Sequence, residues 1–176
     1  DIKRGYIFDS QSRILISLMP KLDLHKIKDS EIPKIRNLIN KKRNAIRLSR
    51  RPKKKVITKD YFINESSGIK IREYEPYATD NENIILYFHG GGYVLNSIDT
   101  HDTTVSYFSE KLRTKVFSLA YSLSPEKKFP FATNEAIAAL NWLTKNGYLM
   151  ENISLCGDSA GAVSYTHLRA HETMAH

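Results

Sequence analysis

Hydrophobic and polar residues alternate with the periodicity of a helix in the first part of this chain. Apolar side chains recur three and four positions apart, as on one face of a helix: Ile35, Leu38, Ile39 and Ile46. Pro33 stands near the start of this pattern, and Arg51-Pro52 is expected to end it, because a proline disfavours helical backbone at the preceding residue. Residues 1–55 are therefore predicted to be a helical segment.

The periodicity of the apolar residues changes after residue 55. Residues 56–63 and 69–74 have the pattern of two strands, joined by the turn Ser66-Ser67-Gly68. Residues 84–88 are continuously apolar, as expected of a strand buried on both faces.

Strands and helices alternate in the remainder. Residues 116–119 and 153–156 are short apolar strands. Two stripes of apolar residues predict helices between the strands: Val105, Phe108 and Leu112, then Ala136, Ile137, Leu140 and Leu143. This alternation implies crossover connections. We therefore predict an α/β fold with a mostly parallel sheet flanked by helices.

Composition limits the class of protein. A chain of 176 residues can form one sizeable domain. The single cysteine, Cys156, forms no internal disulfide, is expected to be buried in its strand, and suits a reducing compartment, so we predict a cytoplasmic location. No apolar run reaches the roughly 18 residues of a membrane span. The first residue is Asp1, and whether a signal peptide precedes it stays open.

The positive charge is concentrated in one place. The net charge is +8, and residues 41–55 alone hold nine Lys or Arg and no acid, so the rest of the chain is close to neutral. An exposed helix face or linker explains this run, and a contact with anionic lipid or RNA is the alternative. The run contains no aromatic residue for base stacking, so we expect no nucleic-acid partner.

Gly157-Asp158-Ser159-Ala160-Gly161 follows a predicted strand and fits the GxSxG nucleophile elbow. Such a turn exposes the serine at the tip of a strand and directs the first amides of the next helix at the reaction centre. Side chains at Gly157 and Gly161 would collide with the neighbouring strand and helix. On this motif alone, a plain glycine turn remains the alternative.

The glycine triplet Gly90-Gly91-Gly92 also follows a predicted strand, directly after His89. Without side chains, backbone N–H groups of such a loop can approach a developing oxyanion. A flexible connection is the alternative for the triplet alone. Both motifs in one chain, in this order and each after a strand, favour a serine hydrolase.

These motifs resemble the α/β-hydrolase esterases and lipases of the hormone-sensitive lipase type. The resemblance covers roughly residues 56–161 and is carried by four segments: His89–Tyr93, Ser97–Asp102, Tyr121–Glu126 with Phe129-Pro130, and Gly157–Gly161. It implies the N-terminal half of an α/β-hydrolase catalytic domain in residues 56–161, and a helical cap in residues 1–55.

The resemblance also implies roles for individual residues. Ser159 would be the nucleophile, and the amides of Gly90, Gly91 and Ala160 would form the oxyanion hole. His89 would support the loop, and Gly92, Gly157 and Gly161 would maintain the backbone of the two motifs. The implied substrate is a small acyl ester, with no cofactor and no metal. Glu126 is expected to anchor its own loop, and His101 to be a surface or packing residue.

The triad of this fold follows the order serine, acid, histidine. After Ser159 the sequence contains no aspartate and one glutamate, Glu172, with His176 as the only later histidine. We therefore expect an incomplete fold, truncated before the triad acid and base and inactive as it stands. Residues 162–176 resemble translated adapter sequence and are expected to be a non-native tail. A non-catalytic ligand-binding receptor on the same fold is the alternative. Acyl chain length and oligomeric state stay open.

Overall fold

A computed structural model describes residues 27–49, 55–64, 68–79 and 81–162. Most of the predicted non-native tail (residues 163–176) and more than half of the predicted cap segment (residues 1–26 and 50–54) lie outside these residues. The described chain forms a five-stranded sheet in the order β1-β2-β4-β3-β5. The strands are β1 (Val56–Asn64), β2 (Ile69–Pro76), β3 (Ile84–Phe88), β4 (Lys115–Ala120) and β5 (Ile153–Gly157). All five strands predicted from the sequence are confirmed, with small differences at their ends.

The sheet is mixed, so the prediction of a mostly parallel sheet was wrong. β3 runs parallel to both β4 and β5, but β1 pairs antiparallel with β2, and β2 pairs antiparallel with β4. The connection from β1 to β2 is short, and two parallel neighbours need a crossover of about a dozen residues or more. The hairpin predicted at Ser66-Ser67-Gly68 therefore requires an antiparallel edge.

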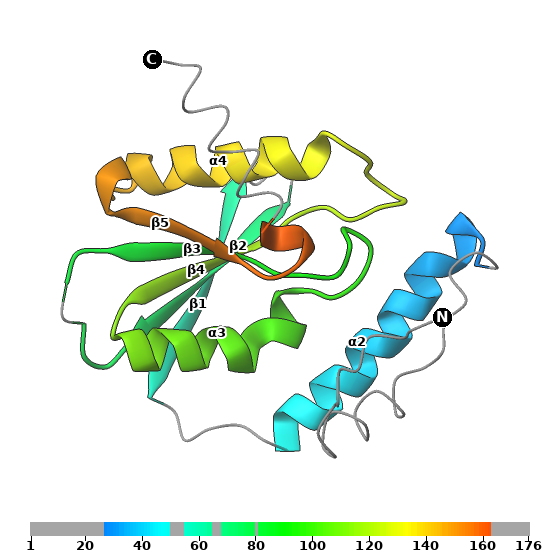
Figure 1. Ribbon diagram of the computed structural model, residues 1–176, viewed down its shortest axis with the longest axis horizontal. Helices are drawn as coiled ribbons and strands as arrows, with labels where there is room; N and C mark the ends of the chain where they lie inside the picture. Colours follow the sequence, from blue (N-terminus) through cyan, green and yellow to red (C-terminus); the bar gives the residue numbers. More distant parts are fainter. Residues whose placement is uncertain (1–26, 50–54, 65–67, 80, 163–176) are drawn as a thin grey trace, which may run out of the picture.

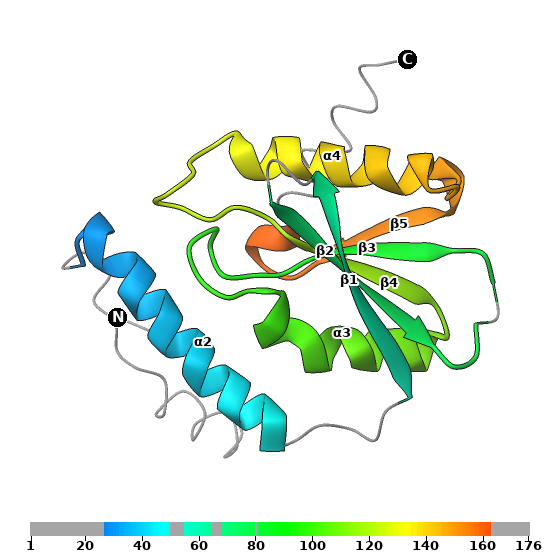
Figure 2. The same ribbon diagram turned by 180° about the vertical axis from the view of Figure 1, so that it is seen from behind.

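Helices cover both faces of the sheet. Figures 1 and 2 show α3 (Ile98–Leu112) on one face and α4 (Phe131–Lys145) on the other, with α2 (Ile32–Ser49) beside α3 and away from the sheet. Two 3₁₀ turns, η2 (Asp29–Glu31) and η3 (Met150–Asn152), precede α2 and β5. All three predicted helices are present, although Leu112 and Leu38 of the predicted apolar stripes are exposed.

The core lies on both sides of β3. Leu86 and Phe88 belong to a cluster with residues of α4, and Tyr87 belongs to a second cluster with Val105 of α3. These strand residues are at most 2% exposed, which confirms the prediction of a strand buried on both faces. Burial of their apolar surface is the main force that holds the layers together.

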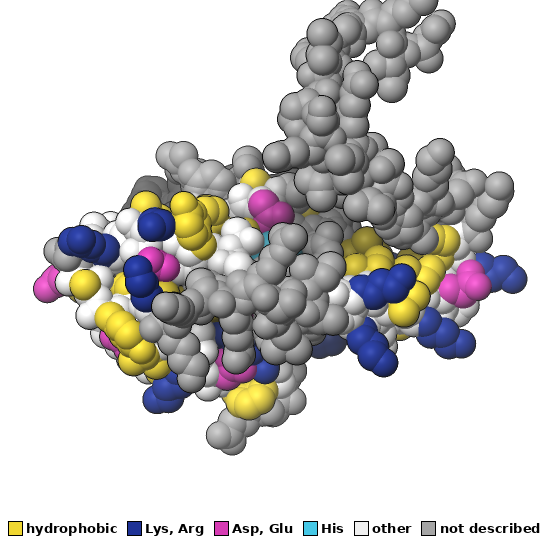
Figure 3. Space-filling model, turned by 90° about the horizontal axis from the view of Figure 1, so that it is seen from below, with side chains coloured by type: hydrophobic (Ala, Val, Ile, Leu, Met, Phe, Trp, Pro, Cys, Tyr) yellow, Lys and Arg dark blue, Asp and Glu magenta, His cyan; other side chains and the backbone are white. Residues whose placement is uncertain are grey.

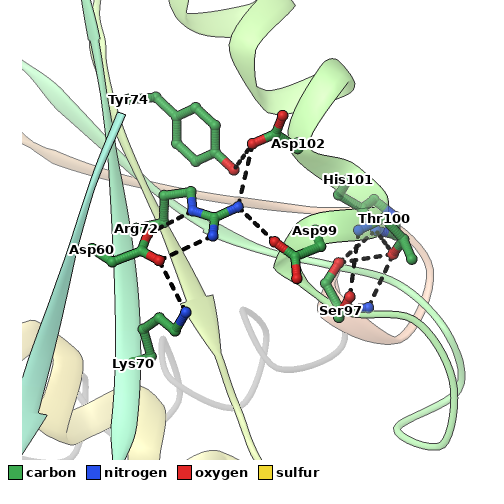
Figure 4. A network of polar contacts seen from close by, with 9 residues as sticks. All are labelled: Asp60, Lys70, Arg72, Tyr74, Ser97, Asp99, Thr100, His101 and Asp102. Carbon is green, nitrogen blue, oxygen red and sulfur yellow. Dashed lines mark hydrogen bonds and ion pairs between the residues drawn. The ribbon is translucent and has the colours of Figure 1, made fainter. Parts of the chain in front are cut away.

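A polar cluster joins the β1–β2 hairpin to the start of α3 (Figure 4). The guanidinium of Arg72 binds both carboxylate oxygens of Asp60 at 2.6 and 3.0 Å. Its Nη1 donates to Asp99 at 2.8 Å and to Asp102 at 3.3 Å, both on α3. The hydrogen bonds from Arg72 lower the pKa of Asp60 to about 2. Arg72 therefore sets where α3 begins relative to the sheet.

The described part of α2 presents a mixed surface. At the right-hand end of Figure 3, where α2 lies, basic and apolar side chains stand side by side. Lys34, Lys41 and Lys42 are exposed, as is Leu38 at 55%. The side chains of residues 43–54, which carry most of the basic run, lie outside the described residues.

Candidate active site

The two glycine motifs emerge side by side from the same edge of the sheet. β3 and β5 are parallel neighbours, and Phe88 at the end of β3 pairs with Gly157 at the end of β5. The glycine loop after β3 and the corner after β5 therefore begin next to each other. In Figures 1 and 2, the green loop after β3 lies beside the red turn after β5.

Ser159 occupies a sharp corner between β5 and a helical turn at residues 160–162. Its φ is +52°, in the left-handed region that residues other than glycine rarely adopt, and the residue is exposed. The corner is closed by hydrogen bonds from Gly161 N to Asp158 O at 2.9 Å and from Ala162 N to Ser159 O at 3.0 Å. This places a hydroxyl at the tip of a strand, where an incoming molecule can reach it.

The glycines of the corner allow a close approach to β3. A Cβ on Gly161 would lie 2.7 Å from the carbonyl carbon of Phe88, and one on Gly157 would lie 2.8 Å from the carbonyl oxygen of Phe88. Both distances are to backbone atoms of a buried strand, which cannot move without disturbing the sheet. The predicted steric reason for these two glycines is therefore confirmed.

Asp158 connects the corner to the glycine loop. Its Oδ1 accepts hydrogen bonds from the backbone N–H of Gly90 at 2.8 Å and from the Tyr87 hydroxyl at 2.7 Å. Its Oδ2 lies 3.5 Å from Nε2 of His101. Burial opposes ionisation of this carboxyl, but these hydrogen bonds hold its pKa below the ordinary value. Asp158 is therefore an anionic link between β3, α3 and the loop.

His89 is buried at the base of the loop, at 1% exposure, between two other rings. It stacks on Tyr121 with ring centroids 4.4 Å apart and on His101 at 5.6 Å. Its Nδ1 lies 3.0 Å from the carbonyl oxygen of Gly90, and the Tyr121 hydroxyl donates to the carbonyl oxygen of His89. Burial lowers the pKa of His89 to about 4, so this ring is neutral at pH 7.

The glycine loop has an unusual backbone. Gly91 and Gly92 have φ values of +134° and +63°, and Tyr93 and Asn96 have φ values of +59° and +71°. Such conformations at non-glycine residues cost of the order of 1–3 kcal/mol each and persist only where surrounding contacts enforce them. Two of those contacts are Asn96 Nδ2 to Gly90 O at 2.9 Å and Leu95 N to Gly91 O at 2.8 Å.

The amides of the loop and the corner are not equivalent. The N–H of Gly90 is engaged by Asp158, whereas within the described ranges the N–H groups of Gly91 and Ala160 have no hydrogen-bond acceptor. Ala160 is also the first residue of its helical turn, where an N–H has no partner in the helix. Among the described residues, one amide of the glycine loop and one of the serine corner are therefore open to a ligand.

Sequence reasoning missed some contributors to this site. Asp158 was predicted only as a member of the Gly157–Gly161 motif. His101 was expected to be a surface or packing residue, and it does pack against the rings of His89 and Tyr87. The contact of His101 with Asp158 depends on how α3 packs beside β3, which no local pattern indicates. In the described part of the chain, no group of three His, Cys, Asp or Glu side chains could hold a metal ion, and no helix is long and apolar enough to cross a membrane.

Comparison with known proteins shows the family of this chain. The family described as alpha/beta hydrolase fold matches residues 85–173, about half of the chain. The chain belongs to this family, as the sequence resemblance indicated. A solved esterase from the bacterial hormone-sensitive lipase family is similar to it, with a TM-score of 0.61 at 26% identity over 77% of this chain and 50% of that one. An arylesterase of Saccharolobus solfataricus is 34% identical over 122 residues, covering 65% of this chain and 40% of that protein. The carboxylesterase NlhH of Mycobacterium tuberculosis is 35% identical over 100 residues, covering 54% of this chain and 31% of that protein.

Solved structures are similar over a larger share of the chain. The Francisella virulence factor BioJ has a TM-score of 0.70 at 35% identity, covering 84% of this chain and 50% of that one. An esterase of Pyrobaculum calidifontis has a TM-score of 0.73 at 26% identity, covering 94% of this chain and 55% of that one. The chain spans less than half the length of the curated relatives it matches.

Proposed function

We propose that this protein is a carboxylic-ester hydrolase for small acyl esters, in which Ser159 is the nucleophile. The observation that carries the proposal is the pairing of Phe88 with Gly157, which brings the glycine loop and the serine corner together. The exposure of Ser159 and the names of the relatives, which are esterases, support it.

In the proposed reaction, Ser159 Oγ attacks the ester carbonyl, and the negative charge develops on the carbonyl oxygen. The free amides of Gly91 and Ala160 stabilise that oxyanion by hydrogen bonds, and each such donor is worth about 10²–10³ in rate. We assign the Gly90 amide a supporting role instead, because Asp158 already occupies it. The alcohol leaves, and water releases the acyl group from the serine.

The proton of Ser159 needs a base that a carboxylate orients. His89 does not suit this task, because it is buried and its pKa is lowered to about 4. The sequence after Ser159 holds no aspartate and one glutamate. We therefore propose that the 176-residue chain alone turns over esters very slowly, by analogy with a loss on the order of 10⁶ when a triad is removed.

The experiment compares this chain with the longest polypeptide that its gene encodes. We expect the longer polypeptide to hydrolyse p-nitrophenyl butyrate and to bind a fluorophosphonate covalently at Ser159, as located by peptide mass spectrometry. Ser159→Ala should abolish both. Ser154→Ala removes an exposed serine of β5 and should change neither.

Label on another residue, or full turnover by Ser159→Ala, contradicts the assignment of the nucleophile. Binding of an ester without turnover in the longer polypeptide would favour a receptor on the same fold.

A further inference from the structure

One side chain of α2 reaches the loops that frame the candidate site. The side chain of Arg36 is 13% exposed. Its Nε donates to the carbonyl oxygen of Val94 at 2.6 Å, and its Nη2 donates to the carbonyl oxygen of Ser124 at 2.5 Å. Its two Nη atoms also bind the Glu126 carboxylate at 2.8 and 3.0 Å. Arg36 thus joins segments that are 58 to 90 residues apart in the sequence.

Both carbonyl partners of Arg36 are tied to the glycine loop. The N–H of Val94 donates to Gly91 O at 3.1 Å, so the peptide groups on either side of Val94 are fixed, one by Arg36 and one by Gly91. The N–H of Ser124 donates to Tyr93 O at 2.7 Å. The loop at residues 121–130 and the glycine loop are therefore held to each other and to α2 at adjacent peptides.

The glycine loop needs such restraint from outside. Left-handed backbone at Tyr93 and Asn96, beside Gly91 and Gly92, is unfavourable unless contacts enforce it. Local hydrogen bonds of the loop supply part of that restraint. Arg36 supplies another part from a separate helix, at the peptide between Val94 and Leu95.

We propose that Arg36 is a positioning residue: by fastening α2 to Val94, Ser124 and Glu126, it fixes the backbone of the glycine loop and thereby the direction of the Gly91 amide. The catalytic meaning of that direction rests on the proposed function. A planar guanidinium can bind a carboxylate with two hydrogen bonds and still reach two carbonyls, whereas the ammonium of a lysine acts as a point charge.

The test uses the 176-residue chain labelled with ¹⁵N-glycine. The chain has eight glycines, so the spectrum is simple, and Gly68 and Gly147 lie far from the loop in sequence and serve as internal references. We expect Arg36→Met to shift or broaden the amide resonances of Gly91 and Gly92 and to leave both references unchanged. In a second, uniformly ¹⁵N-labelled sample, the hydrogen exchange of the Leu95 amide, which donates to Gly91 O, should become roughly tenfold faster or more.

Two further variants separate positioning from general stability. Lys34→Ala removes an exposed charge from the same helix and should move no resonance of the loop. Glu126→Gln weakens the ion pair and leaves the bonds from Arg36 to both carbonyls. It should therefore shift the same resonances as Arg36→Met, by a smaller amount.

The proposal is overturned if Arg36→Met lowers the urea midpoint but leaves the Gly91 and Gly92 resonances in place, because Arg36 is then only structural. If Arg36→Met does not fold, Arg36→Lys decides, because an ammonium group cannot bind both carbonyls and the Glu126 carboxylate as the guanidinium does, and unchanged loop resonances in that variant overturn the proposal. The readout needs no hydrolysis. An inert Ser159 in the longer polypeptide, together with shifted loop resonances in this chain, would therefore refute the proposed function and leave the positioning by Arg36 intact.

Discussion

The backbone N–H of Gly90 donates a 2.8 Å hydrogen bond to Oδ1 of Asp158, the residue before Ser159. This bond joins the loop after β3 to the corner after β5, beyond the last pair of the sheet. It also uses the first amide of the glycine triplet, so that the next amide, of Gly91, is left free to bind an oxyanion in the proposed reaction.

Removal of this link should destabilise the chain. Asp158→Ala leaves the N–H of Gly90 and the hydroxyl of Tyr87 without their acceptor, and unsatisfied buried donors cost about 1–3 kcal/mol each. The Asp158 side chain is 49% exposed, so water can replace some of the lost hydrogen bonds. We therefore expect a loss of about 1–2 kcal/mol in the free energy of unfolding by urea. Asp158→Asn keeps an acceptor oxygen and should lose less. Equal urea midpoints for Asp158→Ala and the unmodified chain would show that this link does not contribute to the free energy of unfolding.

The close approach at Gly161 gives a second prediction. A methyl group there would overlap the backbone of Phe88, so Gly161→Ala should cost about 3 kcal/mol or prevent folding. Gly147→Ala is the control, because a Cβ at Gly147 has open space and only its φ of +92° is unfavourable, which should cost about 1 kcal/mol. Thermal unfolding followed by circular dichroism compares the two. A smaller effect at Gly161 than at Gly147 contradicts the packing described for the corner.

Burial of His89 predicts a dependence of stability on pH. Its pKa is about 4 in the folded chain and 6.5 when exposed, so between these values only the unfolded state takes up the proton. Stability from this group is fully present above pH 6.5 and falls as the pH drops toward 4, by up to about 3 kcal/mol. Urea unfolding at several pH values measures the slope.

His89→Gln is the control for that slope. It lowers stability at all pH values through lost packing, but it removes the titrating ring. Its stability should therefore fall less steeply than that of the unmodified chain between pH 6.5 and 4. Parallel curves for the two proteins would mean that His89 is not held neutral by the fold.

The Arg72 cluster predicts a different acid response. Arg72→Met leaves the carboxylates of Asp60, Asp99 and Asp102 without their shared cation, and we expect a loss of about 1–3 kcal/mol at pH 7. The pKa of Asp60 is lowered from 3.8 to about 2, so its share of that stability is present above pH 3.8 and disappears as the pH falls through 2.

The difference between Arg72→Met and the unmodified chain should therefore shrink between pH 4 and pH 2, as measured by urea unfolding. Arg72→Lys should recover only part of the loss, because lysine cannot bind Asp60 with a planar pair of hydrogen bonds. A difference that stays constant with pH would show that Asp60 contributes nothing to it.

Local pattern was sufficient for the elements of the fold. The continuous apolar run at residues 84–88 predicted β3 with its exact bounds, and the turn at Ser66-Ser67-Gly68 predicted the hairpin. The relative directions of the strands were not predicted correctly. The antiparallel pairing of β2 with β4 joins residues 42 to 50 positions apart, and no local pattern indicates such a pairing. Periodicity reports which face of a strand is buried and contains no information about its neighbour.

The candidate site divides in the same way. Glycines and a serine at fixed spacing indicated a nucleophile corner and an oxyanion loop, because those backbone conformations restrict which residues can occupy them. Glu126 was expected to anchor its loop by hydrogen bonding, and it does so through Arg36 of α2, a partner that no local pattern indicated. Asp158 and His101 meet only because α3 packs beside β3.

The sequence by itself determined the elements, the two motifs and the family of this protein, since each depends on residues that are close along the chain. Only the tertiary structure decided which strand lies beside which, which amide Asp158 occupies, and which helix Arg36 fastens to the glycine loop. Those contacts are made by side chains that any exposed position could carry, and they acquire a role only when packing of the apolar faces brings distant segments within hydrogen-bonding distance.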